Sequence, residues 1–256
     1  MKMTPASKSI TRLVLGMVSY SAPQFRPDPQ LSHLSSTVRS PCPGLNTLAN
    51  HNFIHHAGKS LTIPHLIKGL SEGLNMGPDF TLLIGATGLL ASGNPLLGYF
   101  NLDDLNQHNF PTEHDVSISR SDANLGDAVN FNETVWNHYM SFFNGKQTTD
   151  VSTAAQARYS RFSDSQKNNP QLVFGPKEQV LSLAENALLL QTMSDPLSGR
   201  ANLDYVRTFI QEEKLPFAQG WRPSKTPITL ASLGLMSIEL LAKSPNIPSE
   251  VVQVTK

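Results

Sequence analysis

The sequence contains a single cysteine, Cys42, among 256 residues. One cysteine excludes an internal disulfide framework, a zinc ribbon and a cysteine-ligated iron–sulfur cluster. The chain also lacks an excess of charge, because 20 Lys and Arg balance 20 Asp and Glu. Composition therefore indicates neither a nucleic-acid partner nor an anionic membrane surface. No run approaches the roughly 20 apolar residues of a transmembrane helix, so we expect no membrane-spanning segment.

The N-terminal 39 residues are rich in Ser, Pro and polar residues, and we interpret them as a leader or extended arm. Within them, Lys2, Lys8 and Arg12 precede the short apolar segment 13–18, and small residues follow it. This pattern is typical of a weak secretory signal and favours secretion, although a disordered leader would explain it as well. We assign residues 40–245 to one domain and residues 246–256 to a C-terminal tail.

Helical patterns dominate the domain. Apolar residues make up 39% of the chain, enough for a sizeable core, and long alternating apolar and polar stretches are scarce. We therefore predict an all-α, loop-rich single domain. The segment 79–91 is apolar almost all round and predicts a buried helix. The expected helices span residues 44–53, 64–74, 79–91, 102–105, 122–143, 151–167, 177–193, 205–213 and 227–242.

Cys42 lies between Pro41 and Pro43, directly before an expected helix. The prolines restrict the backbone to extended geometry. Unpaired N–H groups and the helix dipole at a helix N-terminus stabilise a thiolate, so we expect a lowered thiol pKa. A thiolate is the form of cysteine that ligates iron. The alternative is that Cys42 is a small buried apolar residue, as most lone cysteines are.

The segment around Cys42, SPCPGLNTLANH at residues 40–51, resembles the proximal-ligand motif of the chloroperoxidase and unspecific-peroxygenase family of fungal-type haem-thiolate enzymes. The resemblance continues through EHDVSISR (113–120), NFNE (130–133), STAAQ (152–156) and WRPSKTPIT (221–229), and the short branch of the family is the closer match. Together these segments extend over nearly all of residues 40–242. Asn52, His55 and His56 depart from the usual pattern, which puts the shape of that loop in doubt.

This resemblance implies the helical haem-thiolate peroxidase fold and a haem b whose iron is bound by the thiolate of Cys42. It also implies an enzyme that uses hydrogen peroxide to oxidise or oxygenate small apolar or aromatic organic substrates. A role in secondary metabolism would imply an intracellular enzyme. Because Cys42 would be committed to iron, we expect no disulfide-linked oligomer. The alternative is a non-catalytic haem-binding or helical binding protein that kept the fold.

Glu185 and His114 are the expected catalytic acid–base residues. Glu185 lies in the middle of an apolar helix, where burial of a carboxylate is costly and raises its pKa toward that of a proton shuttle. The alternative is a surface glutamate on a polar stripe with Glu178 and Ser182. The resemblance favours the catalytic interpretation, because the family's distal glutamate matches Glu185 within the segment 184–187.

The cluster formed by Glu113, His114 and Ser117 is the expected metal site. Read without the resemblance, it is also consistent with a solvated turn or a helix cap around Asp115. Carboxylate and hydroxyl oxygens suit Mg²⁺. The resemblance implies that Glu113, Ser117 and the backbone carbonyl of His114 bind Mg²⁺ or Mn²⁺ beside a haem propionate, with the His114 imidazole in the distal pocket.

Two further groups of residues have open interpretations. Four histidines, namely His51, His55, His56 and His65, form a loose group in which a zinc or copper site is conceivable, although their spacing matches no recognised metal helix. Six phenylalanines are candidates for a substrate channel, with core packing as the default for each: Phe53, Phe80, Phe110, Phe131, Phe142 and Phe143.

Overall fold

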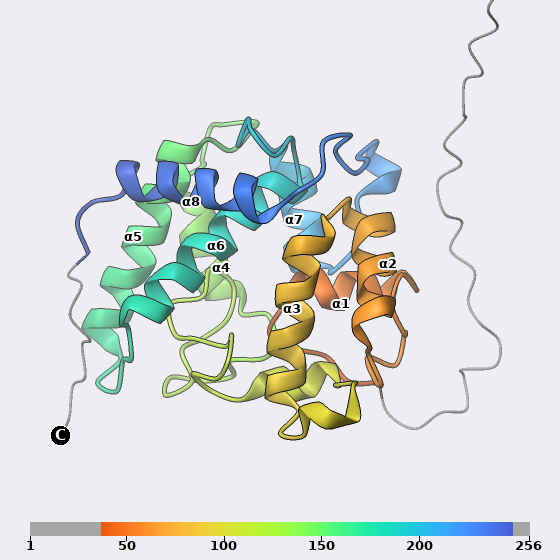
Figure 1. Cartoon of the computed structure of the whole chain (residues 1–256). Helices are drawn as coiled ribbons and strands as arrows, with labels where there is room; N and C mark the ends of the chain where they lie inside the picture. The colour runs from red at the N-terminus through yellow and green to blue at the C-terminus, as the bar shows by residue number, and fades with distance from the viewer. Residues whose placement is uncertain (1–36, 248–256) are drawn as a thin grey trace, which may run out of the picture.

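The computed structural model describes residues 37–247, which form eight α-helices and three short 3₁₀ helices (Figure 1). Within this range there are isolated β-bridges but no β-strand, so the predicted all-α fold is confirmed. None of the described helices is long and apolar enough to span a bilayer. The expected leader lies almost entirely outside the described residues, as does most of the expected C-terminal tail.

The α-helices follow the order α1 (Pro43–Asn50), α2 (Ile63–Leu74), α3 (Pro78–Ala91), α4 (Glu133–Ser141), α5 (Val151–Asn168), α6 (Pro176–Thr192), α7 (Leu203–Gln211) and α8 (Leu230–Lys243). The 3₁₀ helices are η1 (Pro95–Leu97), η2 (Leu102–Asn106) and η3 (Phe217–Gln219). Most of the predicted helices are present, with shifted ends.

Local capping residues explain where the helices begin. Prolines occupy the first turn of α1, α2, α3 and α6, where a missing backbone N–H costs nothing. Asp150 caps α5 by accepting a hydrogen bond from the backbone N–H of Thr153, and Thr229 caps α8 in the same way through Ser232. These caps are encoded within three residues of each helix start.

The predicted helix over 122–143 is wrong in its first half, because α4 begins only at Glu133. Asp122 is buried, and its carboxylate accepts hydrogen bonds from the backbone N–H of Val116 and from the guanidinium of Arg161. These tertiary bonds hold the segment before Asn132 as a loop, and Asn132 then caps α4 through the N–H of Val135.

The prediction that segment 79–91 is buried on all sides is also wrong. Within α3, Leu82, Leu83 and Leu90 each expose about half of their surface, at 49%, 49% and 51%. Phe80, by contrast, is buried. Leu83 faces a cavity instead of the core, so the apolar residues of α3 serve two different surfaces.

The closest helix packing occurs within two groups. In one, α2 packs on α3 and α1 on α7; in the other, α8 packs across α5 and α6, and α4 packs on α5. Figure 1 shows α2 and α3 on one side of the molecule and α5, α6 and α8 on the other. A shared hydrophobic core joins the groups. The cavity described below has walls from both.

Candidate functional site

Cys42 is the N-terminal cap residue of α1, with the extended backbone (φ −81°, ψ 107°) that its proline neighbours predict. Hydrogen bonds from the backbone N–H groups of Gly44 and Leu45 and the positive charge of Arg120 favour the thiolate. Burial outweighs them, so the pKa of the Cys42 thiol is raised, and the expectation of a lowered pKa is wrong. The Cys42 side chain nevertheless has accessible surface, and this surface faces a cavity within the protein.

A buried hydrogen-bond network, which we call the clasp, fixes the backbone around Cys42. The backbone N–H of Ser40 donates to Asn46 Oδ1 (2.9 Å), and Asn46 Nδ2 donates to the Ser40 carbonyl (2.8 Å). Asn46 Nδ2 and Arg120 Nη2 both donate to Glu213 Oε1, each at 2.8 Å. Because Arg120 is almost fully buried, Glu213 supplies the counter-charge that its guanidinium requires.

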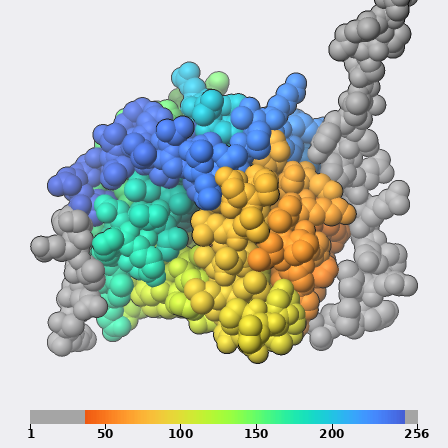
Figure 2. Space-filling model, in the orientation of Figure 1, coloured from red at the N-terminus to blue at the C-terminus, as the bar shows by residue number. Residues whose placement is uncertain are grey.

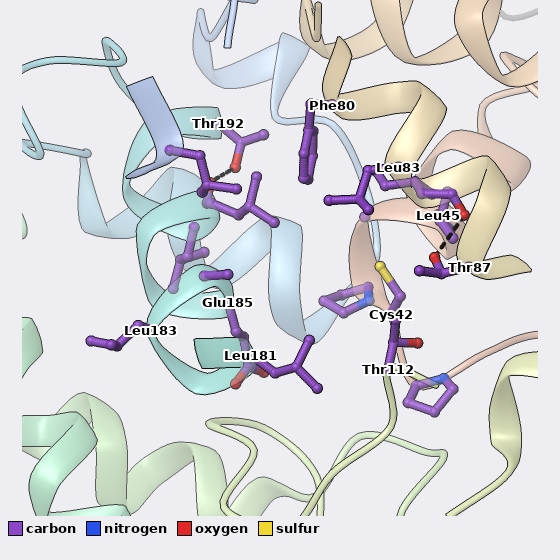
Figure 3. A pocket seen from close by; sticks show the side chains of 18 of the residues that line it. Cys42, Leu45, Phe80, Leu83, Thr87, Thr112, Leu181, Leu183, Glu185 and Thr192 are labelled. Atoms are coloured by element: carbon purple, nitrogen blue, oxygen red, sulfur yellow. Dashed lines mark hydrogen bonds between the residues drawn. The ribbon is translucent and has the colours of Figure 1, made fainter. Parts of the chain in front are cut away.

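Cys42 faces a cavity of about 780 Å³. In Figure 3, Cys42 and Glu185 project from opposite walls, Cys42 from the start of α1 and Glu185 from α6. The cavity is also lined by Glu113, His114 and Ser117. All five site residues predicted from the sequence therefore meet at one cavity, although they span 143 positions of the chain from Cys42 to Glu185.

The carboxylate of Glu185 is only half satisfied. The hydroxyl of Ser117 donates to Glu185 Oε1 at 3.0 Å, whereas Oε2 is buried and has no hydrogen-bond partner. A buried acceptor without a partner is costly, and such atoms often mark a position for a missing ligand or water. Glu185 does not belong to a surface stripe, because Glu178 and Ser182 are themselves buried.

Arg158 of α5 lies fully buried near Glu185. Its Nε donates to Ser182 Oγ at 3.0 Å, while its Nη1 has no partner. Burial lowers the pKa of Arg158 to about 10, and the charge of Glu185 opposes that shift. One acceptor of Glu185, which lines the cavity, and one donor of Arg158, which does not, are thus buried without partners.

His114 lies on the loop between η2 and α4 and is buried. Its Nδ1 lies 2.6 Å from the carbonyl oxygen of Asp115, so Nδ1 carries the proton. In the neutral imidazole this leaves Nε2 unprotonated and able to accept a proton. The neighbouring Asp115 carboxylate accepts backbone hydrogen bonds from Ala123 and Val173, which anchor the loop.

Glu113 and Ser117 do not present a preformed pair of metal ligands. Glu113 Oε2 is bonded to His108 Nδ1 (2.7 Å) and to the backbone N–H of Asn109 (2.9 Å), and Ser117 is bonded to Glu185. Across residues 37–247 no group of three or more His, Cys, Asp or Glu is placed to hold an ion. The expected divalent ion therefore stays a prediction.

The four-histidine group does not assemble into a metal centre. The rings of His55 and His65 lie with their centroids 4.0 Å apart and their planes tilted by 56°, but His51 accepts a hydrogen bond from the backbone N–H of Leu215 and His56 contacts the carbonyl of Ala49. Of the six phenylalanines considered as channel residues, only Phe80 lines the cavity.

The sequence motifs did not identify the buried residues that support Cys42 and Glu185 from outside the cavity lining. Asn46 and Arg120 lie within matched segments but carried no assigned role, and Glu213 and Arg158 carried no signal at all. The sequence of α5 is largely polar, so nothing in it distinguishes Arg158 and Arg161 from exposed residues. That these two arginines are buried is known only from the helices packed around them.

The family model for "Peroxidase, family 2" matches residues 21–226 of the chain. The aromatic peroxygenase of Cyclocybe aegerita is 26% identical over 200 residues, which cover 70% of this chain and 53% of that protein. The aromatic peroxygenase of Coprinellus radians is 25% identical over 202 residues, which cover 70% of this chain and 77% of that protein. The chloroperoxidase of Leptoxyphium fumago is 23% identical over 244 residues, which cover 84% of this chain and 63% of that protein.

The chain thus spans about half the length of the Cyclocybe aegerita relative. The family model, by contrast, matches well over half of the chain, and the match includes the Cys42 segment and the loop that carries His114. By this match the chain belongs to the family 2 peroxidases, the haem-thiolate peroxidase and peroxygenase family.

Proposed function

We propose that this protein is a haem-thiolate peroxidase or peroxygenase that uses hydrogen peroxide to oxidise small organic substrates. The observation that carries the proposal is the placement of the only cysteine on one wall of a large apolar cavity, with Glu185 on the opposite wall. The Glu185 and His114 side chains in the same cavity favour an enzyme over a passive haem carrier, which needs no acid–base pair.

The residues present fit a haem. The cavity volume of about 780 Å³ lies within the roughly 300–1,000 Å³ typical of cofactor and ligand sites. Its lining is mostly apolar and the thiol faces into it. Glu185 also lines it, and the Oε2 atom of Glu185 is buried without a hydrogen-bond partner. Cys42 would hold the iron, and Leu45, Phe80 and Leu83 would contact the macrocycle from the first group of helices.

Bound haem would supply the redox-active iron that reacts with peroxide, a chemistry that belongs to the cofactor. Cys42 would lose its proton on ligation and donate electron density as the thiolate. Its raised pKa favours the protonated thiol in the free chain, so ligation would release a proton.

Glu185 would move the proton of peroxide. Oε2, which has no hydrogen-bond partner, would take a proton from one oxygen of hydrogen peroxide and return it to the other, while the haem, when bound, would supply the electrons for cleavage of the O–O bond. Ser117 would hold Oε1 and so fix the orientation of the carboxylate. His114 Nε2, free to accept a proton, would assist from the neighbouring loop.

The test is the optical spectrum of the haem-loaded, dithionite-reduced chain under carbon monoxide. Thiolate ligation gives a strongly red-shifted Soret band, and we expect that band together with peroxide-dependent oxidation of a simple aromatic dye. A haem-loaded chain with the Soret position of a histidine-ligated protein, or a chain that binds no haem, would overturn the proposal.

We also propose that Glu113, Ser117 and the His114 carbonyl bind Mg²⁺ or Mn²⁺ once haem is present. This requires Glu113 to exchange its hydrogen bonds with His108 and Asn109 for the ion, whereas the Ser117 hydroxyl can offer a lone pair to the ion and still donate its proton to Glu185 Oε1. Metal analysis of the haem-loaded chain should give about one divalent ion per haem, and Glu113→Gln should lower it. Full occupancy in Glu113→Gln would remove Glu113 from the ligand set.

A further inference from the structure

The guanidinium of Arg120 is a buried charge that lies outside the cavity lining. Arg120 is only 1% exposed. Its Nε donates to the Val129 carbonyl (3.3 Å) and its Nη1 to Ser119 Oγ (2.8 Å). Its Nη2 donates to Glu213 Oε1 (2.8 Å), the only charged group among the three partners. The positive charge of Arg120 is therefore fixed in place, with one anion beside it.

Glu213 occupies a backbone position that favours glycine. It follows Glu212, the C-cap residue of α7, and has a φ of 49°. This left-handed conformation is unfavourable for a residue with a Cβ, and glycine is the usual residue just after a helix. Asn46 Nδ2 nevertheless donates to the Glu213 carboxylate (2.8 Å), and Asn50 Nδ2 donates to the Glu213 backbone carbonyl (3.1 Å). A glutamate at this position is explained by its carboxylate and not by its backbone.

Both charges are joined to Cys42 through α1. Asn46, which donates to Glu213 through its side chain, also donates its backbone N–H to the carbonyl of Cys42 (3.2 Å). Helix α1 packs against α7 and α2. Figure 2 shows the face that α2 and α3 form in front of α1, whose position is labelled in Figure 1. The medium between the charges and Cys42 is therefore protein, where solvent screens charges weakly.

The two charges act on Cys42 in opposite directions. Burial is the largest cause of the raised pKa of the Cys42 thiol, while the charge of Arg120 lowers that pKa and the charge of Glu213 raises it. A cation near the sulfur favours the state of the site that carries more negative charge, and an anion disfavours that state. Reduction of a bound iron adds one electron, so the same two charges should oppose each other in its reduction.

Resting on the proposed function, we propose that Arg120 and Glu213 are positioning residues that together set the reduction potential of an iron bound by Cys42. Arg120 raises the potential because its charge stabilises the added electron, and Glu213 lowers it. Both act through Cys42, since neither lines the cavity. At an effective dielectric constant of about 20, loss of one such charge should change the ferric–ferrous equilibrium at least tenfold, which is about 59 mV for one electron.

The first test compares Arg120→Lys with Arg120→Met in the haem-loaded protein. Both variants lose the guanidinium bonds, but only lysine keeps the charge. The midpoint potential of the one-electron reduction from ferric to ferrous iron is measured at pH 7 by titration with dithionite, followed by Soret absorbance. We expect Arg120→Met to be at least tenfold harder to reduce than Arg120→Lys, which should stay near the parent. Equal potentials in the two variants would overturn the proposal.

The second test uses Glu213→Gln, which should shift the potential in the opposite direction, to more positive values. Glutamine keeps an oxygen that can accept from Arg120 and Asn46, so the variant removes mainly the charge. Glu212→Gln is the matched control, because Glu212 pairs with Lys214 at the surface, and its potential should equal that of the parent. A shift in the same direction as in Arg120→Met would indicate a merely structural role and overturn the proposal.

The double variant Arg120→Met, Glu213→Gln leaves neither charge unpaired, and its potential should lie between those of the two single variants. A potential outside that interval would contradict two opposing charges. If Arg120→Met does not fold, Glu213→Gln decides the matter against Glu212→Gln, since an unchanged or more negative potential in Glu213→Gln overturns the proposal.

These outcomes are distinct from failure of the proposed function. A parent chain that takes up no haem, or that lacks the thiolate Soret band, contradicts the function itself. Variants that keep that band but show no opposite shifts contradict only the role of Arg120 and Glu213.

Discussion

The two walls of the cavity are built on opposite principles. On the Cys42 wall, Ser40, Asn46, Arg120 and Glu213 are joined in the clasp, and hydrogen bonds leave the backbone around the thiol little freedom. On the Glu185 side, Glu185 Oε2 and, outside the cavity lining, Arg158 Nη1 are buried without partners. A metal ligand acts best when it is fixed in advance, whereas a proton-transferring group needs hydrogen-bonding capacity for its reactants. The difference predicts which substitutions change chemistry and which change stability.

The largest effect should come from Cys42→Ala. Removing the thiol removes the only thiolate ligand that the chain can offer to iron, so we expect complete loss of the thiolate Soret band and of oxygen-transfer activity. The measurement is the spectrum of the reduced, carbon monoxide-bound protein. An unchanged spectrum in Cys42→Ala would show that the Cys42 wall is not the iron-binding wall.

Glu185→Gln should give the next largest effect. The amide keeps the shape of the side chain but cannot accept the proton of peroxide, and general acid–base groups contribute roughly 10²–10⁴-fold to rate. We expect a loss of that order in the reaction of the ferric protein with peroxide, followed by stopped-flow absorbance. The haem spectrum and fold should be intact.

Two variants sharpen this result. His114→Ala should give a smaller loss if the histidine only assists, and a comparable loss if the two residues act as a unit. Glu178→Gln changes another glutamate of α6 that lies outside the cavity lining, and its peroxide reaction should be normal. A normal rate in Glu185→Gln would leave His114 as the proton acceptor.

Glu213→Ala tests the clasp, and its effect should be on stability. The variant leaves the buried Arg120 guanidinium without its carboxylate and Asn46 Nδ2 without an acceptor. Breaking a buried pair by removing one partner costs about 3 kcal/mol, and we expect a decrease of that size in the free energy of unfolding measured with urea.

Glu212→Ala is the matched control for the clasp. Glu212 is the adjacent residue and pairs with Lys214 at the surface, where both side chains are more than half exposed. Its removal should change the free energy of unfolding by less than about 0.5 kcal/mol. Equal effects of the two substitutions would mean that the clasp contributes nothing specific to the Cys42 wall.

The smallest effect concerns Glu178 and acid pH. Burial raises the pKa of Glu178, but hydrogen bonds from Lys177 and the backbone N–H of Gly175 outweigh it, so the pKa is lowered from its ordinary 4.5. A lowered carboxyl pKa contributes stability above 4.5, and this contribution is lost as the pH falls through the lower, folded-state pKa. Glu178→Gln should therefore lower the free energy of unfolding by about 1 kcal/mol at pH 7. It should not change that free energy below the folded-state pKa of Glu178, as measured by urea unfolding at several pH values. A cost independent of pH would contradict the pairing with Lys177.

The sequence predicted the helices best where the signal is local. Prolines in the first turn and cap residues such as Asp150 act over three or four residues, so the beginnings of α5 and α6 were predicted to within a residue. The same reasoning placed α4 wrongly, because Asp122 is held by Arg161 from a helix 29 residues further on, beyond the reach of any local pattern.

For the candidate site, the sequence by itself determined the isolated cysteine between two prolines and the motif segments that flank the other predicted residues. Only the tertiary structure decided that Glu185 faces the cavity, that Ser117 orients it from 68 residues away, and that Glu213 neutralises Arg120. It also decided the sign of the shift in the Cys42 pKa. The physical reason is that capping and backbone restriction depend on near neighbours in the chain, whereas burial, counter-charges and the shape of a cavity depend on which distant helices pack together.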